Sequence, residues 1–270
     1  MVAAMAPSAE VRVLTFHPHP SEVLAPDRAP VRILDYGDQE RFLIKYGARQ
    51  VAGLQFTQAM AELSAREFFS HEILSLRPGT VVVGHDFRFG KARQAGATEM
   101  AEFCREAGIQ FQALAPILES GKVISSTWVR DCLKSGDFNM ATKLMGHCFT
   151  FSGIVVEGKK LGRTIGFPTA NLELAPERKN KLPLAFGVYA GVCKAEGPFV
   201  MNVGQAPTIS SDAKLKVELH FLNCNKDLYG RRLEVEPQSF IRPEIKFSSL
   251  EELKKQIQND VVAAKYRLKI

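Results

Sequence analysis

The chain lacks several common signatures of nucleotide and nucleic-acid binding. Its 270 residues contain neither a Walker-type G-x-x-x-x-G-K-[ST] segment nor a G-x-G-x-x-G segment, so any phosphate site must use a different loop. The formal net charge is +6, but no run of Lys and Arg concentrates it, and phosphate-bearing substrates explain mild basicity equally well. The single tryptophan, Trp128, lies outside the strand-rich second half, which does not interleave aromatic and basic residues as a nucleic-acid-binding barrel does. We therefore expect no nucleic-acid partner.

Disulfide, zinc and membrane signatures are missing as well. The five cysteines are odd in number, widely spaced and without a C-x-x-C pattern, which argues against a disulfide framework and a zinc site. Small buried hydrophobic residues in a reducing compartment are the simpler interpretation. Residues 1–7 have neither a basic region nor an apolar core, unlike a signal peptide, and no apolar run approaches membrane-spanning length. We expect a cytoplasmic protein with no membrane partner.

The first half of the chain alternates strand-like and helix-like segments. Thr80–Gly84 is a valine run suited to a buried parallel strand, and Ser64 with Glu67 forms a capping box ahead of an apolar helix. The other expected strands are 11–16, 51–56 and 109–115, and the other expected helices are 38–46, 99–107 and 126–134. This alternation predicts an α/β domain with a parallel sheet covered by helices.

The pattern changes after residue 144. Short β-rich segments separated by Gly, Pro and Asn follow, at 149–156, 187–193, 199–203, 215–222 and 232–237. Closely spaced short strands predict an antiparallel β-barrel. A final helix follows, with Ser248 and Glu251 as its expected capping box and Leu250 in its apolar stripe. We place the boundary within 135–146, which gives domains 1–143 and 144–270.

One stretch of the second half combines features of a phosphate and metal site. It begins at Gly162 and reads G-R-T-I-G-F-P-T-A-N. Gly162 and Gly166 permit close backbone approach, and Arg163 adds positive charge. Thr169 and Asn171, two apart on an extended segment, point the same way and offer oxygen ligands suited to Mg²⁺. A glycine-rich hairpin between barrel strands is the alternative, and the stretch alone does not exclude it.

The order of the segments that follow separates these interpretations. The segments are N-V-G at 202–204, P-T at 207–208, V-E-L-H at 217–220, L-Y-G at 228–230 and F-I-R-P-E at 240–244. Together with the glycine-rich stretch they closely resemble the riboflavin kinase domain of the bifunctional riboflavin kinase/FAD synthetase family. The resemblance covers residues 144–260, and P-T-A-N at 168–171 is specific to that family.

The resemblance implies roles for individual residues. Thr169 and Asn171 would hold MgATP, beside the loop of Gly162, Arg163 and Gly166. Glu218 would be the general base that takes the proton of the flavin 5′-hydroxyl, in agreement with the need of a primary alcohol for a nearby carboxylate. Arg242, in a flap after the barrel, would lie near the flavin. Taken without the family motif, a solvated residue on the outer face of a barrel is the better interpretation of Glu218.

The first half resembles the adenylyltransferase domain of the same family, a Rossmann-like nucleotidyltransferase that joins AMP from ATP to FMN. The matching segments are 15–20, 84–90 and 124–130. Asp86, Phe87 and Phe89 would lie at the nucleotide or flavin pocket. The resemblance also implies contacts to the ATP phosphates at the start of a helix, because helix N-termini attract anions. The residues that would make these contacts are Ser125, Ser126, Thr127 and Arg130. An ordinary Ser/Thr cap is the alternative for this helix start.

One family segment has no counterpart here. The family begins with a strand and a G-x-F-D-G-x-H-x-G-H segment whose histidines bind the transferring phosphates, and this sequence contains no such segment. Its absence predicts little FAD synthesis by this chain, an exposed strand edge and a gap in the core. Either the chain is a fragment or has a late-called start, or the domain persists as a scaffold without catalysis. The intact phosphate-binding segments favour the first explanation.

The sequence as a whole predicts an enzyme of two domains. An incomplete α/β domain precedes a barrel that phosphorylates riboflavin to FMN with ATP and Mg²⁺. Riboflavin, FMN and ATP are the expected small-molecule substrates. A non-catalytic flavin- or nucleotide-binding module is the alternative, and the presence of Thr169, Asn171 and Glu218 favours catalysis.

Overall fold

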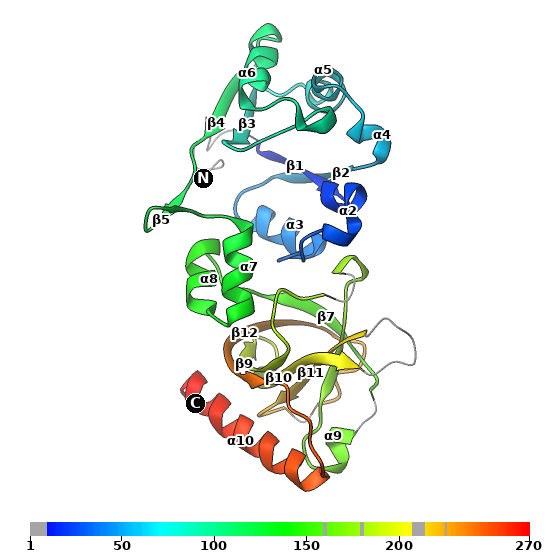
Figure 1. Cartoon of the computed structure of the whole chain (residues 1–270), viewed down its shortest axis with the longest axis vertical. Coiled ribbons are helices and arrows are strands. Elements are labelled where there is room, and N and C mark those ends of the chain that lie inside the picture. The colour runs from blue at the N-terminus through cyan, green and yellow to red at the C-terminus, as the bar shows by residue number, and fades with distance from the viewer. Residues whose placement is uncertain (1–9, 159–160, 179–180, 207–213, 225) are drawn as a thin grey trace. The chain divides into compact units, whose positions relative to one another are not determined.

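The computed structural model describes residues 10–158, 161–178, 181–206, 214–224 and 226–270 (Figure 1), and of Leu161, Arg163, Glu177, Ala206 and Lys214 the backbone alone. The chain forms two compact units. Unit 1 comprises residues 1–30 and 39–124, and unit 2 comprises residues 31–38 and 125–270. The expected division at residue 143 differs from this clustering, because the helices from 126 to 145 group with the barrel.

Unit 1 contains the expected alternation of strands and helices. Its strands are β1 (Arg12–His17), β2 (Gln50–Gln55), β3 (Thr80–Gly84), β4 (Gln110–Leu114), β5 (Leu118–Glu119) and β6 (Lys122–Val123). Its helical segments are α2 (Pro20–Leu24), η1 (Pro26–Arg28), α4 (Gln58–Ala61), α5 (Ala65–Phe68), η2 (Phe69–Ile73), η3 (Leu74–Leu76), η4 (Lys91–Arg93) and α6 (Ala97–Glu106). Helix α3 (Tyr36–Lys45) begins in unit 2 and continues into unit 1. The Ser64–Glu67 capping box is confirmed at the start of α5.

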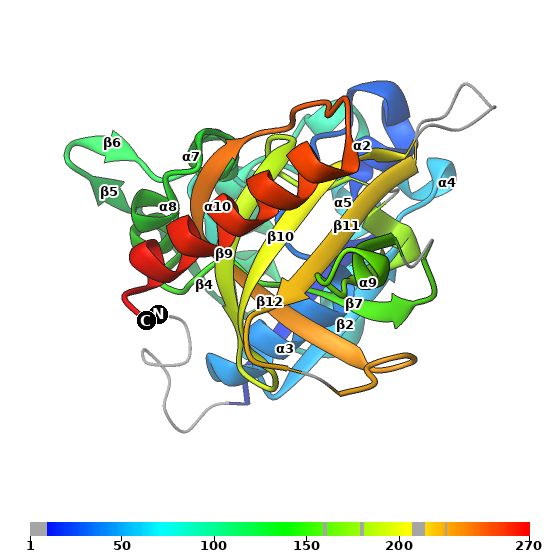
Figure 2. The same cartoon turned by 90° about the horizontal axis from the view of Figure 1, so that it is seen from below.

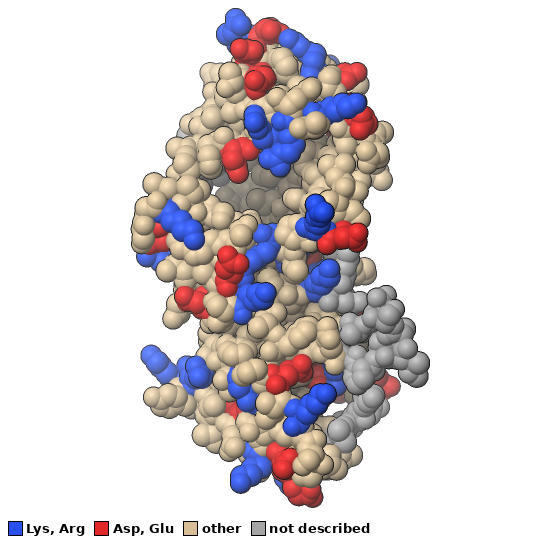
Figure 3. All heavy atoms as spheres, viewed as in Figure 1, with Lys and Arg blue, Asp and Glu red and all other residues tan. Residues whose placement is uncertain are grey.

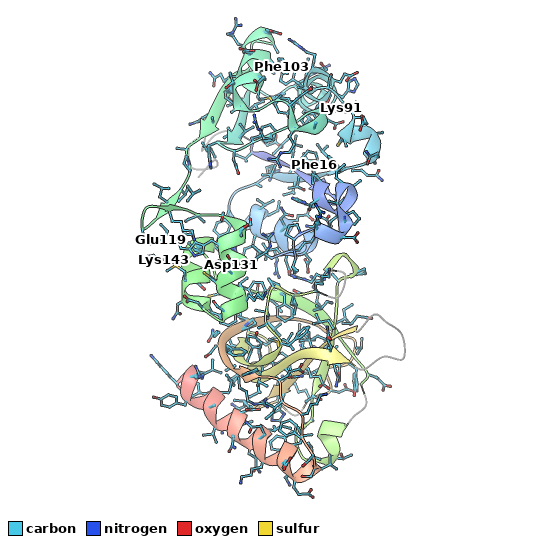
Figure 4. All side chains as sticks on the ribbon, viewed as in Figure 1. Phe16, Lys91, Phe103, Glu119, Asp131 and Lys143 are labelled. Carbon is cyan, nitrogen blue, oxygen red and sulfur yellow. The ribbon has the colours of Figure 1, made fainter. Side chains whose placement is uncertain are left out.

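The parallel strands of unit 1 occur in two pairs. β1 pairs with β2 and β3 pairs with β4, and among the described residues β1 and β3 do not pair with each other. Both pairs contribute to one hydrophobic core, in which Phe16 of β1 contacts Phe68, and Phe103 of α6 contacts Phe69 (Figure 4). Among the described residues, β1 and β3 therefore each have an unpaired edge, in agreement with the expected open strand edge.

Unit 2 is built around a closed antiparallel barrel, which confirms the expected fold. Its strands are β7 (Phe151–Val156), β8 (Ala170–Leu174), β9 (Gly187–Cys193), β10 (Gly197–Ala206), β11 (Lys214–Phe221) and β12 (Arg232–Pro243), in the closed order β10-β11-β8-β7-β12-β9. Its helical segments are α7 (Ser126–Ser135), α8 (Phe138–Met145), α9 (Leu161–Thr164), η5 (Pro176–Arg178) and α10 (Leu250–Leu268). Period-two alternation places Val217, Leu219 and Phe221 in the buried core.

Helix α10 covers part of the outer face of this barrel. It lies across β9 and β10 (Figure 2), and Ala264 packs with Val188, Ala190 and Val200. Its N-terminal cap is Ser249, whose side chain accepts a hydrogen bond from the Glu252 amide, so the expected cap at Ser248 and Glu251 is wrong by one residue. The expected stripe residue Leu250 is also wrong, because 51% of it is exposed.

A buried group of charges ties residues 31–38 to the barrel within unit 2. The Arg178 guanidinium, whose side chain is fully buried, lies 3.5 Å from Asp35 Oδ2 and 3.8 Å from Asp38 Oδ2. Asp38 also accepts a hydrogen bond from Ser152 of β7 and lies near Arg232 of β12. Since removing one partner of a buried pair leaves an uncompensated charge, this group makes the conformation of residues 31–38 dependent on the barrel.

The surface and the cysteines agree with the composition. Lys and Arg alternate with Asp and Glu on the face in Figure 3, without a continuous patch of one sign. All five cysteines are free, and Cys104, Cys132 and Cys193 are buried as expected, whereas Cys148 is exposed. In the described part of the chain, no helix is both long and apolar enough to cross a membrane.

Candidate active site

The barrel register brings two of the expected kinase residues together. Asn171 of β8 pairs directly with Glu218 of β11, and Glu218 pairs on its other side with Asn202 of β10. Directly paired residues point to the same face of a sheet, with their Cβ atoms about 4.5–5.5 Å apart. The strand neighbours of Glu218, Val217 and Leu219, are buried in the barrel, so this face is the outer one.

The outer face of the barrel changes from apolar to polar along the row of paired residues that contains Glu218. Asn202 pairs on its far side with Val188, which belongs to the apolar cluster under α10. From Asn202 to Asn171 the row is polar. A row of polar residues beside a helix-covered apolar surface offers both hydrogen-bonding groups and a hydrophobic wall, which is the usual composition of a small-molecule site.

Two glycines form a cradle for the expected metal-binding side chains. The Asn171 amide lies so close to the Gly158 Cα that a methyl group there would overlap it. A methyl group at Gly162 would overlap the Phe167 carbonyl oxygen and would lie 3.3 Å from Thr169 Oγ1. The Phe167 amide donates a hydrogen bond of 2.8 Å to the Gly162 carbonyl, which closes the loop. Gly166 has a φ of +86°, which glycine adopts without strain. The Arg163 side chain lies outside the described residues.

Lys216 and Asn202 lie beside Glu218, and Glu244 contacts Asn202; none of the three had an assigned role in the sequence analysis. Lys216, on the same face of β11, holds Glu218 Oε2 at 2.7 Å from its Nζ. Asn202 Nδ2 donates a hydrogen bond of 3.2 Å to Glu244 Oε1, and the Glu244 carboxylate packs on Gly204. Strand alternation could have identified Lys216, whereas Asn202 requires the register between strands, which sequence does not supply.

Arg242 lies elsewhere than the sequence predicted. It is part of β12, so the expectation of a flap after the barrel is wrong: β12 continues past Pro237 through register shifts that extend it to Pro243. Its guanidinium binds Asp260 of α10 at 2.8 and 2.7 Å. Arg242 pairs with Val188, and therefore lies on the same outer face as Asn202 and Glu218.

The expected phosphate-binding residues of the adenylyltransferase half are at the start of α7, in unit 2. Ser125 is the N-cap, and its hydroxyl accepts a hydrogen bond of 3.3 Å from the Trp128 amide. Ser125, Ser126 and Thr127 are exposed. Arg130 Nε donates to the Val31 carbonyl at 2.6 Å, and burial lowers the pKa of its guanidinium. This hydrogen bond to Val31 uses Nε and does not involve the two terminal amino groups of Arg130.

The expected pocket residues Asp86, Phe87 and Phe89 follow the carboxyl end of β3 in unit 1. Asp86 is exposed and Phe87 is half-buried, but Phe89 is 5% exposed and belongs to the hydrophobic core. The rings of Phe87 and Phe89 stack at 5.4 Å. Phe89 therefore packs against the ring of Phe87 from the core side. Because Phe89 is buried, it is not placed to line an open pocket. Ligands of open α/β sheets bind at this carboxyl edge, which suits Asp86 and Phe87.

Comparison with known proteins identifies the family of each half of the chain. A family model described as riboflavin kinase matches residues 145–268, and one described as FAD synthetase matches residues 2–128. The bifunctional riboflavin kinase/FMN adenylyltransferase of Escherichia coli K12 is 38% identical over 260 residues, which cover 94% of this chain and 82% of the relative. Proteins of the same description from Pseudomonas fluorescens and Bacillus subtilis are 36% and 32% identical, covering 94% and 92% of this chain and 81% and 79% of the relatives.

A solved structure shares the fold over nearly the whole chain. It is titled as a macrolide-efflux protein from Streptococcus pneumoniae, and it aligns with a TM-score of 0.81 and 28% identity over 98% of this chain and 86% of its own. The sequence relatives, each more than 30% identical over most of both lengths, decide the assignment. The chain belongs to the enzyme family of bifunctional riboflavin kinases/FMN adenylyltransferases.

Proposed function

We propose that this chain phosphorylates riboflavin to FMN with ATP and Mg²⁺, on the outer face of the barrel. The register that pairs Asn171 with Glu218 is the observation that carries the proposal. It sets an expected nucleotide-binding side chain beside the expected base, on strands that are hydrogen-bonded to each other. Such a backbone scaffold can hold reacting groups in the fixed geometry on which phosphoryl transfer depends.

Glu218 is the proposed general base. Its carboxylate accepts the proton of the riboflavin 5′-hydroxyl while that oxygen forms a bond to the γ-phosphorus of ATP, and the bond from this phosphorus to the ADP oxygen breaks. Base assistance of this kind contributes about 10²- to 10⁴-fold to a rate. The Lys216 contact supports this role, because it fixes the carboxylate through Oε2.

The residues present suit a magnesium ion carried by ATP. The glycine cradle leaves room for the Thr169 hydroxyl and the Asn171 amide, whose oxygens are hard ligands, and Mg²⁺ takes phosphate oxygens and water for its other positions. When bound, the metal would offset charge on the transferring phosphate. The proposed role of Gly162, Arg163 and Gly166 is to bring backbone amides and one positive charge to the phosphates.

Arg242 is the proposed flavin contact on the apolar side of the row. Its pairing with Asp260 holds the guanidinium plane in one orientation, and the ring of Phe247 lies 5.9 Å away. A cytoplasmic location belongs to the same proposal, because the five free cysteines suit a reducing compartment.

We further propose that this polypeptide makes little FAD from FMN. The support is the lack of the G-x-F-D-G-x-H-x-G-H segment, whose histidines bind the transferring phosphates in the family. Ser125, Ser126, Thr127 and Arg130 remain the proposed phosphate contacts of the adenylyltransferase half, and Asp86 and Phe87 its proposed pocket residues.

The kinase proposal is tested by chromatography of flavin products after incubation with riboflavin, ATP and Mg²⁺. We expect FMN to accumulate, and its formation to stop when ATP or Mg²⁺ is left out. Binding of riboflavin without any FMN formation would replace the proposal with a non-catalytic flavin-binding module.

A further inference from the structure

His220 lies on the outer face of β11, two residues beyond Glu218. Its strand neighbours, Leu219 and Phe221, are buried in the barrel. The His220 Nδ1 lies 2.9 Å from the carbonyl oxygen of Pro168, which is 52 residues away in the chain. Its ring also packs edge-on against Phe167, with centroids 5.3 Å apart. Two consecutive residues of the glycine-rich loop are thus held by one side chain of the strand that carries Glu218.

The hydrogen bond to Pro168 determines which nitrogen of the His220 imidazole carries a hydrogen. A carbonyl oxygen can only accept, so Nδ1 must carry the hydrogen and donate it. Neutral His220 is then the Nδ1–H tautomer, with the Nε2 lone pair on the opposite edge of the ring. This ring serves as a donor to the loop in both its neutral and its protonated forms.

Fixing the Pro168 carbonyl also fixes Thr169. The Pro168 carbonyl and the Thr169 amide belong to a single peptide unit, which is planar. Holding the oxygen of this unit sets the direction of the Thr169 N–H and the place of its Cα. The Thr169 hydroxyl lies over Gly162, at the other end of the same closed loop.

We propose that His220 is a positioning residue that holds Thr169 in its nucleotide-binding place through the Nδ1–H to Pro168 hydrogen bond. The proposal rests on the proposed kinase function and adds to it a link between the β11 strand and the MgATP loop. His220 acts through the loop backbone and takes no proton from the substrate.

Two substitutions distinguish the contribution of the His220 Nδ1–H hydrogen bond from that of its aromatic ring. His220→Phe keeps an aromatic ring against Phe167 and removes the hydrogen bond, whereas His220→Asn places an amide N–H close to the position of Nδ1. His147→Phe is the matched control, since His147 Nδ1 makes a contact of the same kind, 2.9 Å from the Cys148 carbonyl, away from the row. The measurements are MgADP binding by calorimetry and the KM for MgATP and kcat of FMN formation.

We expect His220→Phe to weaken MgADP binding and raise the KM for MgATP by about 2- to 12-fold, the range of one net hydrogen bond, with a smaller change in kcat and in the KM for riboflavin. His220→Asn should recover most of the affinity, and His147→Phe should bind MgADP as the unaltered protein does. Unchanged MgADP affinity in His220→Phe would overturn the proposal, and so would equal losses in both His220 variants. The unaltered protein is assayed beside the variants: if it binds MgADP but makes no FMN, the kinase proposal fails while the binding results still decide the role of His220.

Discussion

The two groups of candidate residues are held in different ways. In the barrel, Asn171, Glu218 and Asn202 are aligned by continuous strand pairing, and the loop that carries Thr169 is closed at both ends. In unit 1, the loop with Asp86 follows two-stranded sheets that do not pair with each other among the described residues. A closed barrel needs no neighbouring segment to complete its strands, whereas an open strand edge does. The residues proposed for the kinase site are therefore held within one closed sheet, whereas the Asp86 loop follows one of two separate strand pairs.

The largest expected difference concerns the products of the two activities. With riboflavin and MgATP this polypeptide should form FMN, and with FMN and MgATP it should form almost no FAD, because this sequence lacks the G-x-F-D-G-x-H-x-G-H segment of the family. Chromatography of both incubations checks this. FAD formation at a rate close to that of FMN formation would remove the distinction between the two sites.

The buried charges of unit 2 should give the next largest effect. Arg178→Ala removes the buried guanidinium shared by Asp35 and Asp38, although Arg232 stays near Asp38, and we expect a loss of about 3–5 kcal/mol in the free energy of unfolding. The control is Arg66→Ala in unit 1, whose ion pair with Glu106 is exposed and screened by water, so the loss should be much smaller. Urea denaturation of both variants measures the difference, and equal losses would contradict the structural role of residues 31–38.

Gly158→Ala tests the cradle directly. The added methyl group would displace the Asn171 amide, and misplacing a positioning group by about 1 Å can cost up to about 10²-fold in rate. We expect kcat/KM for MgATP to fall by about 10- to 100-fold with little change in stability. Gly79→Ala, where the methyl group meets open space, is the control and should keep full activity. Full activity in Gly158→Ala would separate Asn171 from nucleotide binding.

The smallest effect is expected at the start of α7. Ser125→Ala removes the capping hydroxyl and should lower the free energy of unfolding by about 1 kcal/mol. Ser126→Ala, at an exposed position that does not supply this cap, should change it by less than about 0.5 kcal/mol. Thermal denaturation compares the two. Equal losses would mean that the cap does not account for the hydroxyl residues at this helix start.

Local patterns predicted the elements well and their mutual placement poorly. The valine run gave β3 with its observed bounds, and alternation in β11 identified which residues face the barrel core. β8 was missed as a strand, although Ala170, Leu172 and Leu174 alternate with Asn171 and Glu173, because its five residues directly follow a glycine-rich loop. The α10 cap differs by one residue because Ser248 and Ser249 are both followed by a glutamate three positions later.

The sequence predicted which residues form the candidate kinase site, but it did not predict how they are arranged in space. Family motifs selected Thr169, Asn171 and Glu218, yet the pairing of Asn171 with Glu218 depends on register between strands 47 positions apart in sequence. Register follows from packing of the whole barrel, and no local pattern encodes it. The contacts of His220 with Pro168 and of Gly158 with Asn171 became visible only in the folded structure.

The most direct test of the account is the rate of FMN formation by Glu218→Gln beside Glu173→Gln. Glu173 is an exposed glutamate on β8, two residues beyond Asn171. The amide of Glu218→Gln keeps the shape of the side chain but cannot accept the proton, so kcat should fall by about 10²- to 10⁴-fold while riboflavin binding, followed by flavin fluorescence, is retained. Glu173→Gln should keep the unaltered rate. Undiminished FMN formation by Glu218→Gln would contradict the claim that the polar row on the barrel is the catalytic site.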